Sequence, residues 1–486
     1  MLFNSYIFIL FFFPLCLIGY FGLNHCHREG LSQVFLLLMN LWFYGYFHVG
    51  YLAIMVCSIL INYLFTMAMG KTRAPGLRKA ELILAVLLNL GILFYYKYFN
   101  FFLSHVNGLF GTQLTLRTIV LPLGISFFTF QQISYVVDSY RGEVRRYPFL
   151  LYASFVSYFP QLVAGPIVTH DELIPQFLDP ARKRFDWENF SRGLYLFVLG
   201  LSKKVLIADT FGRAVSWGYR DIAALDTTNA LLVTLAYTFQ IYFDFSGYSD
   251  MAVGLGKMMN IDLPENFRSP YKSHSITEFW KRWHITLTRF LTKYIYIPLG
   301  GSRRGTARTY RNVLIVFLAS GIWHGANDTF LLWGLAHGVM SVLERMGKGR
   351  LPKLPKLLSW ALTFCLLNLS WVLFRADSVA DAGAMYAALF RFDFGPVQAE
   401  LVNAFLTPEI RLLGGLPLLG GLLSLPGVLL SLVYFGGLAL AAVPRNAWEH
   451  MQSFRPRWQN LAATGLLLGL CVLSFSGVST FLYFNF

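Results

Sequence analysis

Apolar runs long enough to cross a membrane recur along the whole chain, from Leu2 to Tyr483, with short polar or basic connections between them. A helix of about twenty apolar residues spans a hydrocarbon core of about 30 Å. No polar stretch is large enough for a separate soluble domain, which needs about a hundred residues. The pattern predicts an all-α, polytopic membrane protein with a single membrane domain over residues 1–486.

The basic connections predict the side of the membrane on which each span ends. Lys and Arg gather in cytoplasmic loops, and the first clusters are His25–Arg28, Lys71–Lys79 and Arg141–Arg146. The N-terminus is therefore expected outside. The run Leu2–Gly22 has no basic segment ahead of it, so we expect a retained first span rather than a cleaved signal peptide. The first five expected spans are 2–22, 31–47, 49–69, 80–103 and 118–137.

The run Phe149–Val168 is expected to enter the membrane and return on the same side. It contains Pro160 and the pair Gly165-Pro166, and a full crossing would leave the basic cluster Arg182-Lys183-Arg184 outside. The later expected spans are 190–210, 229–249, 312–325, 329–344, 357–375, 414–443 and 459–483. About twelve crossings result. They form N-terminal helices in 1–137, a core with re-entrant segments in 138–345 and C-terminal helices in 346–486.

Composition supports a membrane protein and narrows its partners. Hydrophobic residues make up 56% of the chain and charged residues only 13%, whereas soluble proteins carry about 25% charged residues. The net charge of +15 comes from clusters in the connections, as in cytoplasmic loops, so no nucleic-acid partner is expected. The five cysteines show no Cys-x-x-Cys spacing, so neither a disulfide framework nor a metal site is predicted.

The segment Ile276–Pro298 predicts an amphipathic helix at the membrane interface or re-entering the membrane. Its apolar residues recur at helical spacing, and Lys281 and Arg282 lie on the opposite face. His284 falls at the edge of the apolar stripe and is expected to point along or into the protein. Spacing alone favours a polar residue extended toward the lipid headgroups over a functional one.

His324 lies in the turn Trp323–Asp328, between two apolar arms that are short for full spans. Ionisable groups in hydrocarbon cost at least about 2.5 kcal/mol, so they usually face a cavity or a partner. Burial favours the neutral imidazole, which accepts a proton, so His324 is a candidate general base if a hydroxyl reaches it. A core histidine bonded to a nearby carbonyl explains the position equally well.

Further polar residues are site candidates of lower weight. Asp244 and Asp250 lie in an apolar run, so we expect them to line a cavity or to pair with Lys or Arg. His337 follows on the second arm of the hairpin as a secondary candidate. The basic residues of the long loop either attract a phosphate-rich donor or mark a plain cytoplasmic loop; they are Lys281, Arg282, Arg303, Arg304, Arg308 and Arg311. No Gly-x-x-x-x-Gly-Lys loop occurs, so an ATP-driven pump is not expected.

Several segments of the chain form motifs that are specific in combination. The motifs are Leu121-Pro122-Leu123-Gly124-Ile125-Ser126-Phe127, Phe159-Pro160-Gln161-Leu162-Val163-Ala164-Gly165-Pro166, Tyr242-Phe243-Asp244-Phe245-Ser246-Gly247-Tyr248-Ser249-Asp250, Glu278-Phe279-Trp280-Lys281-Arg282-Trp283-His284, Tyr294-Ile295-Tyr296-Ile297-Pro298-Leu299-Gly300-Gly301, Gly321-Ile322-Trp323-His324-Gly325-Ala326-Asn327 and Phe481-Leu482-Tyr483-Phe484-Asn485-Phe486. These motifs closely resemble those of the membrane-bound O-acyltransferase family, bacterial alginate O-acetyltransferase branch. The resemblance covers most of the chain.

The resemblance implies a helical acyltransferase of the bacterial inner membrane, with a central cavity or tunnel. His324 would be catalytic and His284 its functional partner, with Asn327 near enough to position a substrate. Trp323, Trp283, Arg282, Asp244, Asp250 and His337 are the further substrate-contact candidates. The implied donor is a cytoplasmic thioester, acetyl-CoA or an acyl carrier protein, entering past His284. No bound cofactor is expected.

The implied acceptor is an exopolysaccharide such as alginate, reached directly or through a periplasmic acetyltransferase within a polysaccharide synthesis complex. The sequence does not identify the polymer. D-alanyl transfer to a cell-envelope glycan is the nearest competing reaction. A transporter that uses buried Asp and His residues as a proton relay, or a non-enzymatic export component, would not need a thioester donor. The motifs favour the enzyme.

Overall fold

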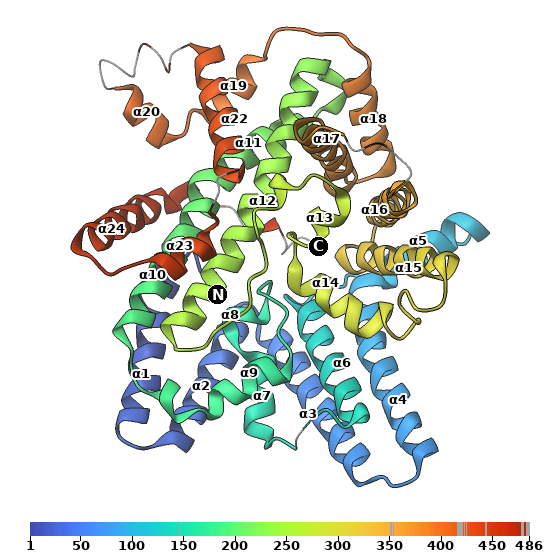
Figure 1. Ribbon diagram of the computed structural model, residues 1–486, viewed down its shortest axis with the longest axis vertical. Helices are drawn as coiled ribbons and strands as arrows, with labels where there is room; N and C mark the ends of the chain where they lie inside the picture. The colour runs from blue at the N-terminus through green and yellow to red at the C-terminus, as the bar shows by residue number, and fades with distance from the viewer. Residues whose placement is uncertain are drawn as a thin grey trace. The chain divides into compact units, whose positions relative to one another are not determined.

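The computed structural model describes residues 1–144, 146–349, 352, 354–415, 421, 423, 425–442, 445–477, 481 and 482. Within these residues the chain is helical and contains no strand, as expected (Figure 1). Parts of the expected spans 414–443 and 459–483 lie outside the described residues. The expected three-part division of the chain stays a prediction.

The chain forms two compact units. Unit 1 comprises residues 1–197, 249–264 and 451–461, and unit 2 comprises residues 198–248, 265–450 and 462–486. The helices α10 (Trp187–Ser202), α12 (Thr227–Met258), α23 (Ala447–Ser453) and α24 (Trp458–Leu473) contribute residues to both units.

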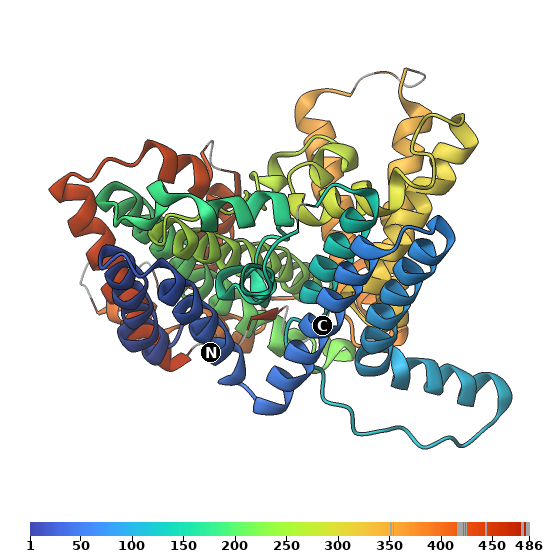
Figure 2. The ribbon, with the colours of Figure 1, turned by 90° about the horizontal axis from the view of Figure 1, so that it is seen from below.

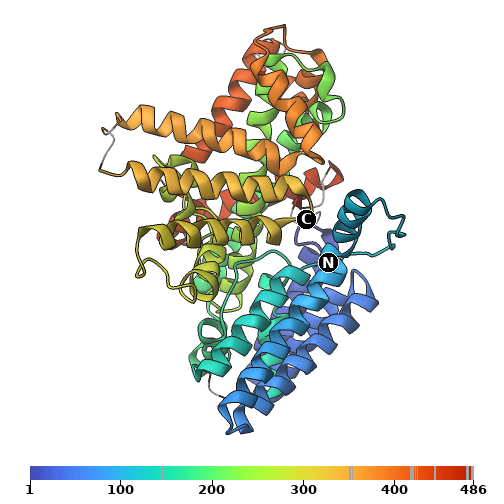
Figure 3. The ribbon, with the colours of Figure 1, turned by 90° about the vertical axis from the view of Figure 1, so that its right-hand side faces the viewer.

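Unit 1 is built mainly from N-terminal helices. They are α1 (Phe13–His25), α2 (Glu29–Gly45), α3 (Val49–Lys71), α4 (Pro75–Leu93), α5 (Phe99–Phe110), α6 (Ile125–Arg141), α7 (Phe149–Ser157), α8 (Phe159–Leu162) and α9 (His170–Leu178). Helices α3, α4 and α6 lie side by side (Figure 3). A small apolar cluster of Met69, Ala85 and Val136 packs between them.

An uncharged polar network joins the same three helices. Asn62 Nδ2 donates to Asn89 Oδ1 at 3.1 Å and to Gln132 Oε1 at 2.6 Å, and Gln132 Nε2 donates to Ser58 Oγ at 3.0 Å. All four side chains are buried. In an apolar environment these amide side chains have few other hydrogen-bond partners. Their hydrogen bonds to one another therefore fix the register of the three helices.

Four helical stretches of the described chain are long and apolar enough to cross a membrane: Phe8–His25, Val49–Lys71, Pro75–Phe110 and Lys356–Arg375. The bent pair Pro426–Ala442 and Ala447–Ser453 would be a fifth if it forms one span. Other expected spans also form helices, but these fall short in length or apolar content; α2 and α6, for example, have only 17 residues each.

One expected segment differs from the structure in detail, and another matches it. The expected span 118–137 begins only at Ile125, because residues 111–124 form a non-helical connection after α5 (Figure 2). Asn100 and Asn107 on α5 hold this connection through hydrogen bonds to the main chain of Arg117 and Leu114. The run Phe149–Val168 is broken as expected: α7 ends at Ser157, and a short α8 follows before the helix ends ahead of Gly165.

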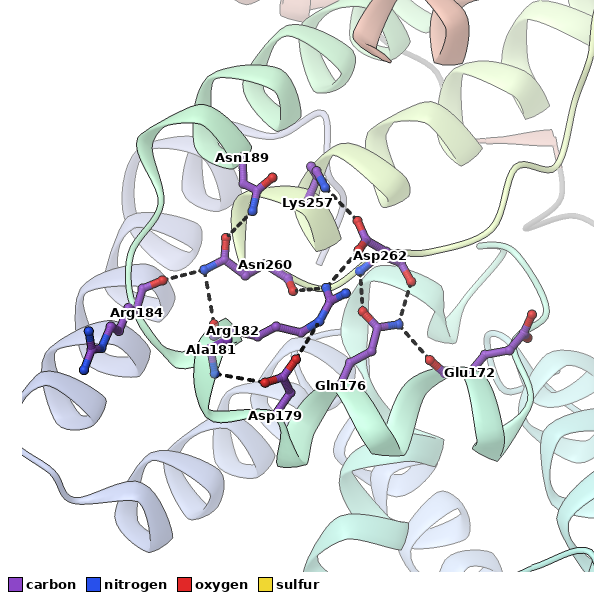
Figure 4. Close-up of polar contacts among 10 residues, drawn as sticks. All are labelled: Glu172, Gln176, Asp179, Ala181, Arg182, Arg184, Asn189, Lys257, Asn260 and Asp262. Carbon is purple, nitrogen blue, oxygen red and sulfur yellow. Dashed lines mark hydrogen bonds and ion pairs between the residues drawn. The ribbon is translucent and has the colours of Figure 1, made fainter.

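A polar latch in unit 1 ties the end of α12 to the connection between α9 and α10 (Figure 4). Arg182 donates to the main-chain oxygen of Asn260 at 2.7 Å and pairs with Asp262 at 2.8 Å. Lys257 also pairs with Asp262 at 2.8 Å. Partial burial would raise the pKa of Asp262, but the hydrogen bonds from Lys257 and Arg182 outweigh it and lower this pKa.

Asn260 is the centre of this latch and allows a test of it. Its backbone is left-handed (φ 60°), and its side chain bonds to the main-chain oxygens of Arg182 and Arg184 and to Asn189. Asn260→Gly should destabilise the protein by about 1 to 3 kcal/mol through lost hydrogen bonds. Asn260→Ala should cost about 1 kcal/mol more, because alanine is strained at positive φ. Equal thermal unfolding of the two variants in detergent would contradict this account.

Candidate active site

The candidate site lies in unit 2. The helices lying wholly in this unit are α11 (Asp209–Gly218), α13 (Ile276–Trp280), α14 (Ile285–Leu291), α15 (Thr306–His324), α16 (Asp328–Gly347), α17 (Lys356–Arg375), α18 (Val379–Phe390), α19 (Ala399–Phe405), α20 (Pro408–Gly414) and α22 (Pro426–Ala442). Helices α15, α16 and α17 lie side by side (Figure 3).

The expected hairpin around His324 is present. Helix α15 ends at His324, and α16 begins at Asp328. The two helices pack closely through glycines: a Cβ at Gly321 would collide with the main-chain oxygen of Phe330, and one at Gly334 with that of Phe317. This close approach places the His324 imidazole against the second arm, where its ring lies 5.1 Å from that of Trp333.

The prediction of one continuous amphipathic helix over 276–298 is wrong. The segment breaks between α13 and α14 because His284 adopts a left-handed backbone (φ 45°, ψ 53°), and a π-helical turn, Thr292–Tyr296, continues α14. A left-handed residue cannot continue a right-handed helix and costs about 1 to 2 kcal/mol. The break turns His284 inward, and the side chain is fully buried rather than extended toward headgroups.

The two candidate histidines lie close together. Their ring centroids are 6.4 Å apart, and His284 and His324 are 0% and 2% exposed. Aromatic rings enclose the pair: Phe245 lies 4.8 Å from His284, and Phe374 lies 5.1 Å from His324. The aromatic enclosure excludes water and strengthens hydrogen bonds formed inside it.

Asn266 holds the His284 ring. Its Oδ1 lies 3.1 Å from His284 Nδ1 and accepts hydrogen bonds from Thr286 Oγ1 at 2.9 Å and Thr286 N at 3.3 Å. The main-chain oxygen of Asn266 accepts from Ile285 N at 3.0 Å. Burial lowers the pKa of His284 to about 3, so the ring is neutral at pH 7.

Trp323 packs against both histidines. Its ring lies 5.9 Å from His284 and 4.9 Å from His324. Trp283 instead packs into the core of the unit, with ring centroids 5.0 Å from Phe267 and 5.0 Å from Trp371.

Two other candidates make local contacts. Asn327 caps α16, with its Oδ1 accepting from Thr329 N at 3.1 Å and its Nδ2 donating to Asp377 O at 2.6 Å. Arg282 pairs with Glu278 at 2.9 Å and donates to the main-chain oxygen of Arg268. These contacts explain both residues without a substrate, and their predicted substrate contacts stay predictions.

His337 sits in a chain of hydrogen bonds whose direction is defined. Trp280 Nε1 can only donate, and it lies 3.3 Å from His337 Nδ1. The Nε2 of His337 is therefore protonated and donates to Ser370 Oγ at 3.1 Å, and that hydroxyl donates to Leu367 O at 2.7 Å. These hydrogen bonds fix the Trp280 ring, which lines a cavity described below.

Asp244 forms the ion pair that its apolar surroundings predict. Its Oδ1 lies 2.7 Å from Lys204 Nζ, which also contacts Asp209 Oδ1 at 2.8 Å, and all three side chains are buried. Asp244 Oδ2 accepts from the main-chain nitrogen of Leu482 at 3.0 Å. Asp244 directly precedes Phe245, the ring against His284. Asp250 belongs to unit 1, where it is half-buried on α12.

A cavity of about 320 Å³ lies between α13, α14, α15 and α16. Its wall is mainly apolar and includes Trp280, Phe317 and Ser320, the last one helical turn before His324. Lys281 and Arg345 add positive charge. A second cavity of about 430 Å³ shares Trp280 and Lys281 and adds the cations Arg289 and Lys293.

The model of the membrane-bound O-acyltransferase family matches residues 41–375, which contain both histidines. The chain belongs to this family. The match to this family agrees with the helical fold and with the apolar helices. The chain is therefore a membrane protein.

Curated relatives include O-acetyltransferases. The chain is 41% identical to the peptidoglycan O-acetyltransferase of Helicobacter pylori, over 79% of this chain and 78% of that protein. It is 40% identical to the probable alginate O-acetylase AlgI of Pseudomonas aeruginosa, over 84% of this chain and 78% of that protein. The teichoic acid D-alanyltransferase of Bacillus subtilis is more distant: it is 26% identical, over 45% of this chain and 57% of that protein. This membrane-bound O-acyltransferase is therefore an enzyme that transfers acyl groups.

Sequence reasoning about this acyltransferase missed Asn266 and did not identify Lys204 as the partner of Asp244. Asn266 lies in the polar segment Pro264–Arg268, far from His284 in sequence, and no spacing rule links the two. Lys204 carried a usable signal, because a lysine inside an apolar run needs a carboxylate partner.

Proposed function

We propose that this protein transfers an acetyl group from a cytoplasmic thioester to a hydroxyl group for O-acetylation of a cell-envelope glycan at the bacterial inner membrane. The acceptor is an exopolysaccharide such as alginate, reached directly or through a periplasmic acetyltransferase. The observation that carries the proposal is the enclosed pair of buried histidines, His284 and His324, in a chain about 40% identical to O-acetyltransferases.

In the proposed reaction every bond formed is matched by a bond broken, and the protein's own residues carry the proton. The acceptor oxygen attacks the thioester carbonyl while His324 takes the hydroxyl proton. The C–S bond breaks as the ester C–O bond forms, and the proton on His324 passes to the leaving thiolate. A positioned base contributes about 10² to 10⁴ in rate, and the enclosed site favours the transfer over hydrolysis by water.

The cavity beside α15 supports a thioester donor such as acetyl-CoA or an acyl carrier protein. Its apolar wall suits a thioester arm, and the four cations Lys281, Arg289, Lys293 and Arg345 suit phosphate groups. Ser320 lies on the wall one turn before His324, so a donor arm lying along α15 would bring its thioester toward this histidine.

The relatives favour acetyl over D-alanyl transfer. The two O-acetylation relatives match about four-fifths of the chain at about 40% identity, whereas the D-alanyltransferase matches less than half at 26%. D-alanyl transfer remains the second candidate function because the matching segment still covers 230 residues.

The proposed function is tested with the purified protein in liposomes. Labelled acetyl-CoA, an acetylated carrier protein and a D-alanylated carrier protein are supplied at the cytoplasmic face, with alginate or peptidoglycan fragments opposite. We expect labelled acetyl esters on the glycan fraction, with one free thiol released per ester. A periplasmic acetyltransferase is added where direct transfer is slow. Glycan modification without thiol release, or faster D-alanyl than acetyl transfer, would contradict the proposal.

A further inference from the structure

Main-chain hydrogen bonds join the segment around Asn266 to the strained backbone on both sides of His284. Arg268 N donates to Arg282 O at 2.9 Å, and Ile285 N donates to Asn266 O at 3.0 Å. These two bonds pair residues 266–268 with 282–285 across the left-handed turn. A strained residue persists only where its surroundings over-determine it, and such residues cluster at functional sites. Asn266 therefore contributes its main chain as well as its amide to the placement of His284.

The orientation of the Asn266 amide is fixed by a group that can only donate. Thr286 N lies 3.3 Å from Oδ1, and a main-chain N–H has no acceptor function. A flipped amide would place its NH₂ group against this N–H. Because Oδ1 is thus an acceptor, the His284 nitrogen 3.1 Å away must be the donor, so Nδ1 carries the hydrogen.

A neutral imidazole carries one hydrogen, so Nε2 of His284 bears the lone pair. In this tautomer Nε2 accepts a hydrogen bond and cannot donate one to the carbonyl oxygen of a thioester. The ring centroids of His284 and His324 are 6.4 Å apart, which is too far for a direct N–H···N hydrogen bond. The two rings therefore do not bond each other directly, and the lone pair on Nε2 is the hydrogen-bonding function that the His284 ring can offer to a substrate.

We propose that Asn266 is a positioning residue that locks His284 in the Nδ1–H tautomer, so that His284 binds the acyl acceptor through one of its O–H groups. This inference rests on the proposed function, in which His324 takes the attacking proton. A hydroxyl has one hydrogen, so His284 binds a neighbouring hydroxyl. Acceptors with adjacent hydroxyl groups, as in sugars, fit this arrangement.

The surroundings of His284 make its protonation sensitive to residue 266. The rings facing it from α12 and from the preceding loop, Phe245 and Phe267, are apolar, and the titratable group facing it from α15 is His324. A carboxylate in place of the Asn266 amide would lie against Nδ1 and favour the imidazolium, raising the pKa by about one to three units. Protonated Nε2 can no longer accept a hydrogen bond.

The tautomer itself is measured first, in full-length protein labelled with ¹⁵N-histidine in liposomes. Comparison with His284→Gln assigns the His284 signals. We expect a protonated Nδ1 and an unprotonated Nε2 at neutral and mildly acidic pH. A protonated Nε2 in the wild type would overturn the inference. This measurement needs no substrate, so it decides the tautomer even where the transfer assay fails and the proposed function falls.

Kinetics then test the consequence for the reaction. Asn266→Asp should move the acid limb of the kcat/KM profile up by about one to three pH units. Asn266→Ala should raise the KM for the glycan and lower kcat, together about tenfold in kcat/KM, without raising the KM for acetyl-CoA. The control Asn368→Ala removes another buried amide of the same unit, which donates to Thr238 Oγ1 at 2.7 Å, and should change kcat/KM less than threefold. An unmoved acid limb in Asn266→Asp, or a raised KM for acetyl-CoA alone in Asn266→Ala, would overturn the inference.

Discussion

Replacing His324 by glutamine is expected to lower acetyl transfer by about 10² to 10⁴ while the protein stays folded. Glutamine is similar in size and polar, but it cannot take the proton of an attacking hydroxyl at neutral pH. His324 is 2% exposed and enclosed by Trp323, Trp333 and Phe374, so no bulk water substitutes for the base. The measurement is label transferred to glycan per minute at saturating acetyl-CoA.

The matched control for this variant is His170→Gln. His170 is also 2% exposed, but it belongs to unit 1, where it lies 3.5 Å from Asp138. Glutamine can keep this contact through its NH₂ group, so most of the activity should remain. Equal losses in the two variants would indicate that general damage to the fold, rather than lost chemistry, explains the effect of His324→Gln. Full activity of His324→Gln would exclude His324 as the base.

Replacing Lys204 by methionine is expected to destabilise the protein by about 3 to 5 kcal/mol. The substitution leaves the Asp209 and Asp244 carboxylates buried without their cation, although each lies within 2.8 Å of Lys204 Nζ in the wild type. Lys204 Nζ also lies 4.8 Å from the Phe481 ring, so the contact with the C-terminal segment is lost as well. Thermal unfolding in detergent and the yield of monodisperse protein measure the effect.

Two further variants separate this ion pair from a general loss of charge. Lys203→Met removes the same charge one residue earlier from a half-buried side chain and should cost much less. Lys204→Met combined with Asp209→Asn and Asp244→Asn removes the uncompensated charges and should recover part of the lost stability. A triple variant no more stable than Lys204→Met would show that the buried charges are not the cause.

Local sequence patterns were sufficient where a property depends on neighbouring residues. The hairpin around His324 was predictable, because Gly325 and Asn327 interrupt two apolar arms, and the structure confirms the turn there. The break in 149–168 was predictable from Pro160 and Gly165 for the same reason. The partner of Asp244 was predictable in kind, since a buried carboxylate needs a cation, but not as Lys204.

Helical periodicity failed at His284. The segment 276–298 has the apolar spacing of a continuous helix, yet the chain turns left-handed at His284 because residues 266–268 pair with its backbone. A contact between residues eighteen positions apart leaves no trace in a local pattern. The same contact decides which nitrogen of His284 carries the hydrogen.

The sequence by itself determined that this protein is a helical membrane acyltransferase with two histidines as its candidate chemistry, because apolar length, basic connections and motif residues are properties of the chain alone. The tertiary structure decided how the histidines act. Only folding encloses His284 and His324 among aromatic rings, presents Asn266 to one imidazole and aligns a charged cavity along α15, because these relations join segments that are distant in sequence.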